Sequence, residues 1–416
     1  MLWTAVMPPR AVRQLTPLAG LMSDMTADPQ VLIIGGGNAG ISLAARLHRH
    51  GVSRIAIIEP KDTHTYRPLL SYAGAGLASA TEYQRDQSTV MPRGVRWIRG
   101  AVRRVDPSQS LVELTDGSVI GYEQVVICAG STPNWSTVPG SEQAVSSPYA
   151  STNYVPELAP KTWQLIQRIR RGNAVFTIPA GPAPCPQAGQ KILYLACDYW
   201  QRQGVLADID VTLVTPTAGV FGISAIDRQL EPWVTRYGIT VLTHARPTRI
   251  DSADRVMHIQ GRTGTQDLRF DFLHHTPVHA APTWIAEAGL ANATGYADVD
   301  PETLRHTSVP TVWACGDAAD ADCSRSGGAL RHQTRVLASN LVSVLAGKAP
   351  SDRYDGYSVS PITVARGRAL VAEYDRARQL TPTIPGIGLT HPRRSWWVAD
   401  RHVLPHQYWN SILKGR

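Results

Sequence analysis

The chain has 416 residues, of which 43% are hydrophobic and 18% are charged, and its formal net charge at pH 7 is +8. This composition excludes a disordered chain, and no run approaches the roughly 18 apolar residues of a membrane-spanning helix. The five cysteines include no C-x-x-C pair, so we expect neither a disulfide framework nor a metal site. No basic run is long enough to follow a phosphate backbone, so we expect no nucleic-acid partner.

Residues 1–28 are expected to form a flexible N-terminal extension. They carry Arg10 and Arg13, as a targeting segment would, but their apolar run is too broken for a secretory signal. Met22 and Met25 lie at the usual distance ahead of the first strand, so translation could also begin there.

The stretch VLIIGGGNAGISLAARLHRHGVSRIAIIEP (31–60) predicts a strand, a glycine turn, a helix and a second strand. Gly35, Gly37 and Gly40 have the spacing G-x-G-x-x-G, which allows a tight turn, a close approach of the backbone to a pyrophosphate, and close helix packing. Glu59, nineteen residues after Gly40, ends the second strand, where an acid accepts hydrogen bonds from a ribose. Together these features predict a dinucleotide site.

Two later strands end in small-residue turns and indicate that the dinucleotide is FAD. The segment YEQVVICAG (122–130) ends at Gly130, and TVWACGDAAD (311–320) contains Gly316 and Asp317. The three segments resemble those of the two-dinucleotide flavoproteins, in which such an aspartate binds the ribityl chain of the flavin. Cys128 and Cys315 lie within the strands and are interpreted as core residues.

The second half of the chain lacks a second glycine fingerprint. The strand NAVFTI (173–178) is followed by PAGPAPCPQAG, in which prolines surround Cys185. Proline has no N–H to offer a phosphate, so we do not expect a nicotinamide nucleotide here. Pro186 is expected to be the first residue of a helix, which would place Cys185 at the N-cap, where the dipole favours a thiolate. Cys185 is therefore the predicted entry point for electrons.

From residue 30 onward the chain resembles the sulfide:quinone oxidoreductases, in particular the mitochondrial branch. The resemblance is carried by segments such as SSPYASTNYVPELAPKTW (146–163), FTIPAGPAPCPQAGQKILYL (176–195), YDGYSVSPI (354–362) and LPHQYWNSILKGR (404–416). It implies a peripheral membrane enzyme that oxidises sulfide at a redox-active cysteine, passes two electrons through FAD and reduces ubiquinone or menaquinone. We expect such a protein to be cytoplasmic and attached to the inner face of the membrane.

The resemblance also assigns single residues. Cys185 matches the first catalytic cysteine of the family. The other matches are to cofactor contacts: Glu59 and Val102 for the adenosine, Arg67 for the flavin, Asp317 for the ribityl chain, and Arg325, which replaces a family lysine near the flavin pyrimidine edge.

The second catalytic cysteine of the family is replaced here by Ser360, directly before Pro361. A serine can neither hold sulfur nor form a bridge, and three alternatives follow. Cys185 works alone while an external acceptor collects the sulfur, or Cys323 acts as a displaced partner, or the protein oxidises another donor.

Residues 376–416 form the expected membrane and quinone segment. Trp396, Trp397, Tyr408 and Trp409 are accompanied by cations such as Lys414 and Arg416, as in a helix that lies in a membrane interface. Helical spacing places Tyr408 and Trp409 on one face. Packing of this helix on the flavin domain, or a dimer contact, is the alternative.

The expected fold is α/β with two Rossmann-like dinucleotide-binding domains. The FAD domain is discontinuous (29–150 and 296–375) and encloses the second domain (151–295), which carries Cys185. The activity that fits best is that of a sulfide:quinone oxidoreductase. The alternatives are an NAD(P)H:quinone reductase and a flavin-bound redox protein that lost sulfide turnover through Ser360. The oligomeric state stays open, with a homo-oligomer as one option.

Overall fold

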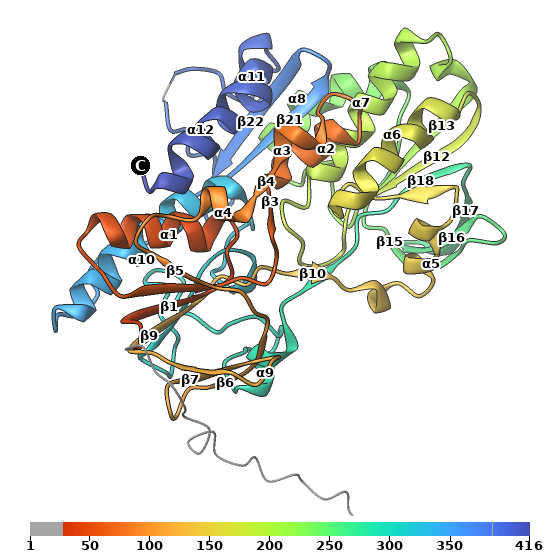
Figure 1. The fold of residues 1–416 in the computed structure, drawn as a ribbon. Helices are drawn as coiled ribbons and strands as arrows, with labels where there is room; N and C mark the ends of the chain where they lie inside the picture. Colours follow the sequence, from red (N-terminus) through yellow and green to blue (C-terminus); the bar gives the residue numbers. More distant parts are fainter. Residues whose placement is uncertain (1–27, 385) are drawn as a thin grey trace, which may run out of the picture.

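The computed structural model describes residues 28–384 and 386–416 (Figure 1). The N-terminal extension expected over residues 1–28 lies, apart from Asp28, outside the described residues.

A five-stranded parallel sheet forms the centre of the first domain. Its strand order is β20–β9–β1–β2–β5. The glycine turn leads from β1 into α1, and α1 packs against α10 on one side of the sheet, while the three-stranded sheet β6–β7–β8 lies on the other side (Figure 1). The bounds are β1 (Val31–Ile34), α1 (Asn38–Arg49), β2 (Ile55–Ile58), β5 (Arg96–Ile98), β6 (Val102–Asp106), β7 (Leu111–Leu114), β8 (Val119–Gly121), β9 (Gln124–Ile127), β20 (Val312–Ala314) and α10 (Gly327–Leu345).

A second five-stranded parallel sheet, in the order β11–β18–β12–β13–β14, forms the other domain. Helices α6, α7 and α8 lie next to this sheet, and the antiparallel sheet β15–β16–β17 extends from it (Figure 1). The bounds are β11 (Ala150–Ser151), α6 (Ala159–Arg168), β12 (Gly172–Thr177), α7 (Ala188–Arg202), β13 (Ile209–Val214), α8 (Ser224–Tyr237), β14 (Thr240–Leu242), β15 (Arg246–Asp251), β16 (Val256–Gly261), β17 (Gly264–Arg269) and β18 (Phe272–His274).

The hairpin β21 (Ser358–Ala365) and β22 (Arg368–Tyr374) packs on α7. Ile362 and Leu370 of this hairpin belong to the same buried cluster as Ile192 of α7. The hairpin comes from the range assigned above to the FAD domain, yet its core side chains join the second sheet. We therefore propose that the second domain includes it.

Short elements connect these layers. A two-stranded pair, β10 (Thr132–Pro133) with β19 (His279–Ala280), lies where the chain crosses between the two domains (Figure 1). The remaining elements are β3 (Thr63–Thr65), α2 (Leu70–Ala73), α3 (Ala80–Tyr83), β4 (Gln84–Asp86), α4 (Gln87–Val90), α5 (Ser141–Ser146), α9 (Thr283–Glu287), α11 (Arg394–Val398) and α12 (Leu404–Asn410), with a π-helical turn Ala399–Val403 between the last two.

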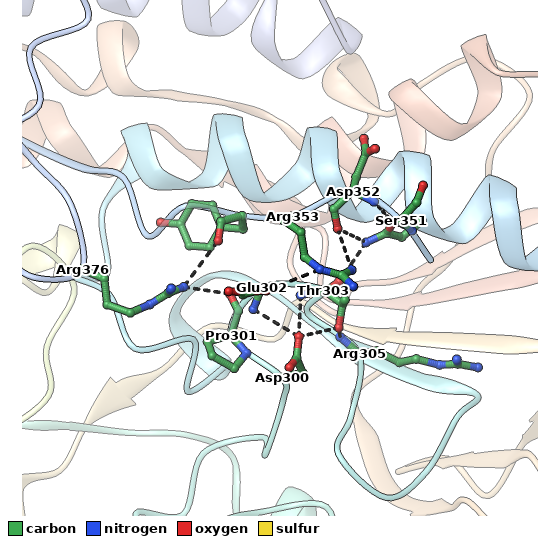
Figure 2. A network of polar contacts seen from close by, with 11 residues as sticks. Asp300, Pro301, Glu302, Thr303, Arg305, Ser351, Asp352, Arg353 and Arg376 are labelled. Carbon is green, nitrogen blue, oxygen red and sulfur yellow. Dashed lines mark hydrogen bonds and ion pairs between the residues drawn. The ribbon is translucent and has the colours of Figure 1, made fainter. Parts of the chain in front are cut away.

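A polar network holds the turn before β20 in place (Figure 2). The Asp300 carboxylate accepts hydrogen bonds from the backbone N–H groups of Glu302 (3.2 Å) and Thr303 (2.7 Å). Arg353 forms an ion pair with Glu302 (3.4 Å), and Arg376, which follows β22, donates to the Pro301 carbonyl (3.1 Å). These contacts connect the turn to the loop after α10 and to the end of the hairpin. They therefore hold in place the segment that leads into β20, the strand before Asp317.

Candidate active site

A cavity of about 1450 Å³ opens between the first domain, α7, the hairpin and the C-terminal helices. It exceeds the roughly 300–1,000 Å³ of ordinary small-molecule sites, so it has room for a dinucleotide and a second ligand. Most of the residues singled out from the sequence line it: Gly35, Gly37, Glu59, Arg67, Val102, Gly130, Cys185, Gly316, Asp317, Arg325, Ser360, Trp396 and Tyr408. Gly40, Cys323, Trp397 and Trp409 lie outside this lining.

The glycine turn has the geometry of a nucleotide cradle. Gly35 has φ +111°, and a Cβ there would lie 2.4 Å from the Cys128 carbonyl oxygen. A Cβ on Gly40 would lie 1.9 Å from the Gly35 carbonyl oxygen, which explains why the helix can start so close to the strand. A Cβ on Gly37, by contrast, would meet open space, and Gly37 is the N-cap of α1, so the N-terminal N–H groups of this helix lie at the cavity. These residues fit the diphosphate of FAD.

The Glu59 carboxylate lies beside this turn. It accepts a hydrogen bond from the Gly36 N–H (2.8 Å) and another from the Lys61 N–H (2.9 Å). These two bonds hold the side chain at the end of β2, where it lines the cavity, and leave lone pairs for ribose hydroxyls. The ribose role expected from its spacing stays a prediction.

Asp317 also lines the cavity and follows β20. Burial raises the pKa of its carboxyl group, while the guanidinium groups of Arg67 and Arg325 act in the opposite direction. Arg67 is held by a hydrogen bond to the Tyr154 carbonyl (2.8 Å), and Arg325 lies over the Tyr296 ring at 4.0 Å. The three side chains therefore form a polar wall on which the hydroxyls of a ribityl chain would find partners.

The loop that carries Cys185 is not the helix start that the sequence indicated. Helix α7 begins at Ala188, and its N-cap is Gln187, so the N-cap position expected for Cys185 is wrong. Cys185 instead adopts φ 47°, which is uncommon for a residue with a side chain. Its N–H donates to the Arg325 carbonyl (2.6 Å), and its own carbonyl accepts from the Tyr154 hydroxyl (2.9 Å). The loop is therefore hydrogen-bonded to both domains.

The electrostatic surroundings of the Cys185 thiol differ from those of a helix N-cap. Burial raises its pKa, and the Asp317 and Asp400 carboxylates act in the same direction. The Lys191 ammonium group and a hydrogen bond from Ser360 oppose them. The thiol is partly open to the cavity, but it depends on Lys191 and Ser360, and not on a helix dipole, for stabilisation as a thiolate.

Ser360 lies beside Cys185, as the resemblance of its segment to the family implied. Its hydroxyl is within hydrogen-bonding reach of the Cys185 sulfur and lies 3.4 Å from the Tyr374 hydroxyl. The Cys323 sulfur is engaged elsewhere: it accepts from Gln333 Nε2 (3.4 Å) and interacts with the Tyr354 hydroxyl. The geometry favours the residue pair Cys185 and Ser360 over a pair with Cys323.

A buried charged network near the thiol was missed from the sequence. Lys191 Nζ lies 2.9 Å from Asp400 Oδ2, and only 6% and 4% of their side-chain surfaces are exposed. The Tyr72 hydroxyl donates to the same carboxylate oxygen (2.7 Å) and lies 2.6 Å from Thr363 Oγ1. Lys191 and Asp400 both line the cavity. A signal for Lys191 existed, because it is a lone lysine on the apolar face of a predicted helix in a chain with few lysines.

Two of the four aromatic side chains near the C-terminus, Tyr408 and Trp409, are buried in the protein. Tyr408 and Trp409 are 2% and 6% exposed, so the expectation that they meet a membrane is wrong for these two residues. The Tyr408 hydroxyl lies 2.6 Å from His64 Nε2, and Arg85 lies over the Trp409 ring at 4.2 Å. Burial lowers the pKa of His64 to about 4, so the imidazole is neutral at pH 7. The turn Ile412–Lys414 that follows α12 packs against α1, and Tyr408 and Trp409 belong to the core cluster of the first domain.

Exposed large hydrophobic side chains are found in the segment that precedes α12. All of their exposed large hydrophobic side chains fall between residues 380 and 403: Leu380, Ile384, Ile387, Val398 and Val403. Trp396 lines the cavity and Trp397 packs against the first core. Several exposed apolar side chains on one segment are typical of an interaction site.

Two kinds of site are absent from the part of the chain that the structure describes, a membrane-spanning helix and a metal centre. Within them, no helix is both long and apolar enough to cross a membrane. No group of three or more histidine, cysteine, aspartate or glutamate side chains in the same residues is placed to hold a metal ion.

Comparisons with known proteins agree with this geometry. The family model described as "Pyridine nucleotide-disulphide oxidoreductase" matches residues 29–338. The chain is 29% identical over 392 residues to a mitochondrial sulfide:quinone oxidoreductase of Mus musculus, covering 93% of this chain and 86% of the mouse protein. It is 27% identical to the Dictyostelium discoideum protein of the same name, with the same coverage. The solved structure of the sulfide:quinone oxidoreductase from Aquifex aeolicus shares the fold, with a TM-score of 0.79 at 16% identity over 93% of this chain and 92% of that one. The resemblance seen in the motifs and the α/β fold class are thereby confirmed.

Proposed function

The chain belongs to the pyridine nucleotide-disulphide oxidoreductase family, and we propose that it is an FAD-dependent enzyme that oxidises sulfide, or a related small sulfur donor, at Cys185 and reduces a membrane quinone. The names of its relatives support this assignment, because the similarity runs over nearly the whole chain. The proposed acceptor is ubiquinone or menaquinone.

One observation carries the proposal. The partly open Cys185 thiol lines the same cavity as the glycine turn and Asp317, although it comes from a different domain. Its backbone is bonded to Arg325, which is part of the Asp317 wall. A sulfur nucleophile is therefore fixed inside the site that the nucleotide-binding residues define.

The residues around Cys185 have separate tasks in this reaction. Lys191 and the Ser360 hydroxyl favour the thiolate, which is the nucleophilic form. Joining the sulfur of HS⁻ to the Cys185 sulfur forms one S–S bond and releases one proton and two electrons. When bound in the cavity, FAD supplies the two-electron chemistry that accepts these electrons and passes them to the quinone. Because Ser360 cannot take over the added sulfur atom, a small thiol or sulfite from solution has to remove it from Cys185.

The loop at Cys185 also argues against a nicotinamide donor. Pro182, Pro184 and Pro186 leave few backbone N–H groups between β12 and α7, and one of them, that of Cys185, is already bonded to Arg325. A pyrophosphate would find little to bind there. The position of a second nucleotide is occupied instead by the thiol-bearing loop.

The C-terminal segment supports a quinone and a membrane surface as partners. Trp396, Leu404 and Ile412 line the cavity, and the exposed apolar side chains lie on the same segment. We propose that this segment rests on the inner face of the membrane and leads the apolar quinone from the lipid into the cavity. Exposed apolar side chains at a membrane surface are stabilised by insertion below the headgroups.

The test is anaerobic addition of sulfide, and separately of NADH, to the FAD-loaded protein, followed by a short-chain quinone. We expect sulfide to bleach the flavin absorbance and the quinone to restore it, while NADH leaves the absorbance unchanged. Bleaching by NADH but not by sulfide would make the protein an NADH:quinone reductase. No bleaching by either would mean a flavin-bound protein without this turnover.

A further inference from the structure

Four arginines line one end of the cavity wall, where α1, α10 and the C-terminal turn meet. Arg46 lies on α1, Arg331 and Arg335 lie on the first half of α10, and Arg416 follows the turn Ile412–Lys414. The turn is packed tightly at this point, because a Cβ on Gly415 would lie 2.7 Å from the Arg46 backbone nitrogen.

A carboxylate lies near this cluster, since Asp355 Oδ1 is 3.9 Å from His332 Nδ1 on α10, but within the described residues it is not paired with any of the four arginines. Among residues 28–384 and 386–416, none of the four guanidinium groups forms an ion pair with a carboxylate. The Nε of Arg46 is buried and has no hydrogen-bond partner. Burial lowers the pKa of Arg46, and the charges of Arg331, Arg335 and Arg49 lower it further. Mutual repulsion of this kind costs free energy unless an anion neutralises it.

Arg46 and Arg335 lie away from the place where the FAD diphosphate is expected. That place is the N-terminal end of α1, at Gly37 and Asn38. Arg46 follows Asn38 by eight residues, which corresponds to about 12 Å along a helix that rises about 1.5 Å per residue. Arg335 is likewise eight residues beyond Gly327, the first residue of α10. A diphosphate bound at these helix ends would therefore lie about 12 Å along the helices from Arg46 and Arg335 and closer to Arg331, which is four residues beyond Gly327.

We propose that Arg46, Arg331, Arg335 and Arg416 form a binding site for a phosphate group. Guanidinium groups bind phosphate oxygens in a bidentate manner and stay charged at any physiological pH. Apolar side chains line the same cavity, among them Ile384, Leu389 and Trp396, and Ile384 is 50% exposed. This combination favours the phosphodiester of an anionic phospholipid as the ligand over a free phosphate. The proposal does not depend on the sulfide reaction.

The test compares two double variants of the FAD-loaded full chain. Arg331→Gln/Arg335→Gln removes two exposed members of the cluster, and Arg262→Gln/Arg269→Gln removes two exposed arginines in and beside β17 of the second domain, outside the cavity lining. Binding is measured by flotation with phosphatidylcholine vesicles that contain or lack phosphatidylglycerol. We expect the cluster variant to bind phosphatidylglycerol vesicles about twenty-five-fold more weakly, about five-fold for each arginine, while the control keeps the wild-type affinity.

A second measurement distinguishes the source of the phosphate. Inorganic phosphate at constant ionic strength is added, and the thermal unfolding midpoint of each protein is recorded. A rise in wild type and control but not in the cluster variant, without any preference for phosphatidylglycerol, would support the site with a free phosphate as its ligand. The proposal is overturned if the cluster variant and the control behave alike in both measurements.

Discussion

The buried pair of Lys191 and Asp400 gives the sharpest energetic prediction. At 2.9 Å and an effective dielectric constant of about 20, the attraction between two unit charges is about 6 kcal/mol. Desolvation offsets part of it, so replacing one partner alone is expected to lower the free energy of unfolding by about 3–5 kcal/mol. Lys191→Met leaves the Asp400 carboxylate buried, and among the described residues the Tyr72 hydroxyl is then its remaining hydrogen-bond donor. Replacing both residues should cost much less than the sum of the two single changes.

The assay is a double-mutant cycle on the FAD-loaded protein, with the free energy of unfolding measured in urea. Lys191→Met, Asp400→Asn and the double variant are compared with the same cycle on Arg249 and Asp251. That control pair has the same 2.9 Å separation, but its side chains are 59% and 25% exposed. We expect a coupling energy of about 3 kcal/mol or more for the buried pair and less than about 1 kcal/mol for the control. Equal coupling energies in the two cycles would refute the reasoning.

Three further outcomes are expected. Because burial raises the pKa of the Cys185 thiol, its alkylation by iodoacetamide should reach half-maximal rate at a higher pH than for a free cysteine. Lys191→Met should move this pH up, because it removes a positive charge near the thiol, and Asp400→Asn should move it down, because it removes a negative charge. A midpoint below that of a free thiol would contradict this. Ser360→Cys should form a disulfide with Cys185 and raise sulfide turnover, and two free thiols after mild oxidation would speak against it. Replacing Ile384, Val398 and Val403 by serine should lower the affinity for vesicles by about ten-fold per residue, with FAD content unchanged; undiminished binding would show that another surface meets the membrane.

Features that depend on a few neighbouring residues were predictable from the sequence. The turn at Gly35, Gly37 and Gly40 was found because the need for a missing Cβ is local, and contacts such as 1.9 Å from Gly40 to the Gly35 carbonyl explain the spacing. The strand before Asp317 and the α/β fold followed from the same kind of pattern. The prediction that α7 starts at Pro186 was wrong, because a proline is as compatible with a turn as with the first position of a helix.

Features that depend on distant parts of the chain were not predictable in this way. Lys191 and Asp400 are 209 residues apart, and only the fold brings them together. The aromatic face at Tyr408 and Trp409 was visible as a helical pattern, but an apolar face packs equally well on lipid or on protein. Its partners, such as His64, lie more than 300 residues away in the sequence, so the choice was decided by tertiary packing.

The most direct test of the central claim is the anaerobic reaction of sulfide with three FAD-loaded proteins: wild type, Cys185→Ser and Cys323→Ser. All three should bind FAD, because neither cysteine belongs to the glycine turn. We expect sulfide to bleach the flavin of wild type and of Cys323→Ser at similar rates and to leave the flavin of Cys185→Ser oxidised. A Cys185→Ser protein whose flavin bleaches at the wild-type rate would contradict the account, because the electrons would then enter without this thiol.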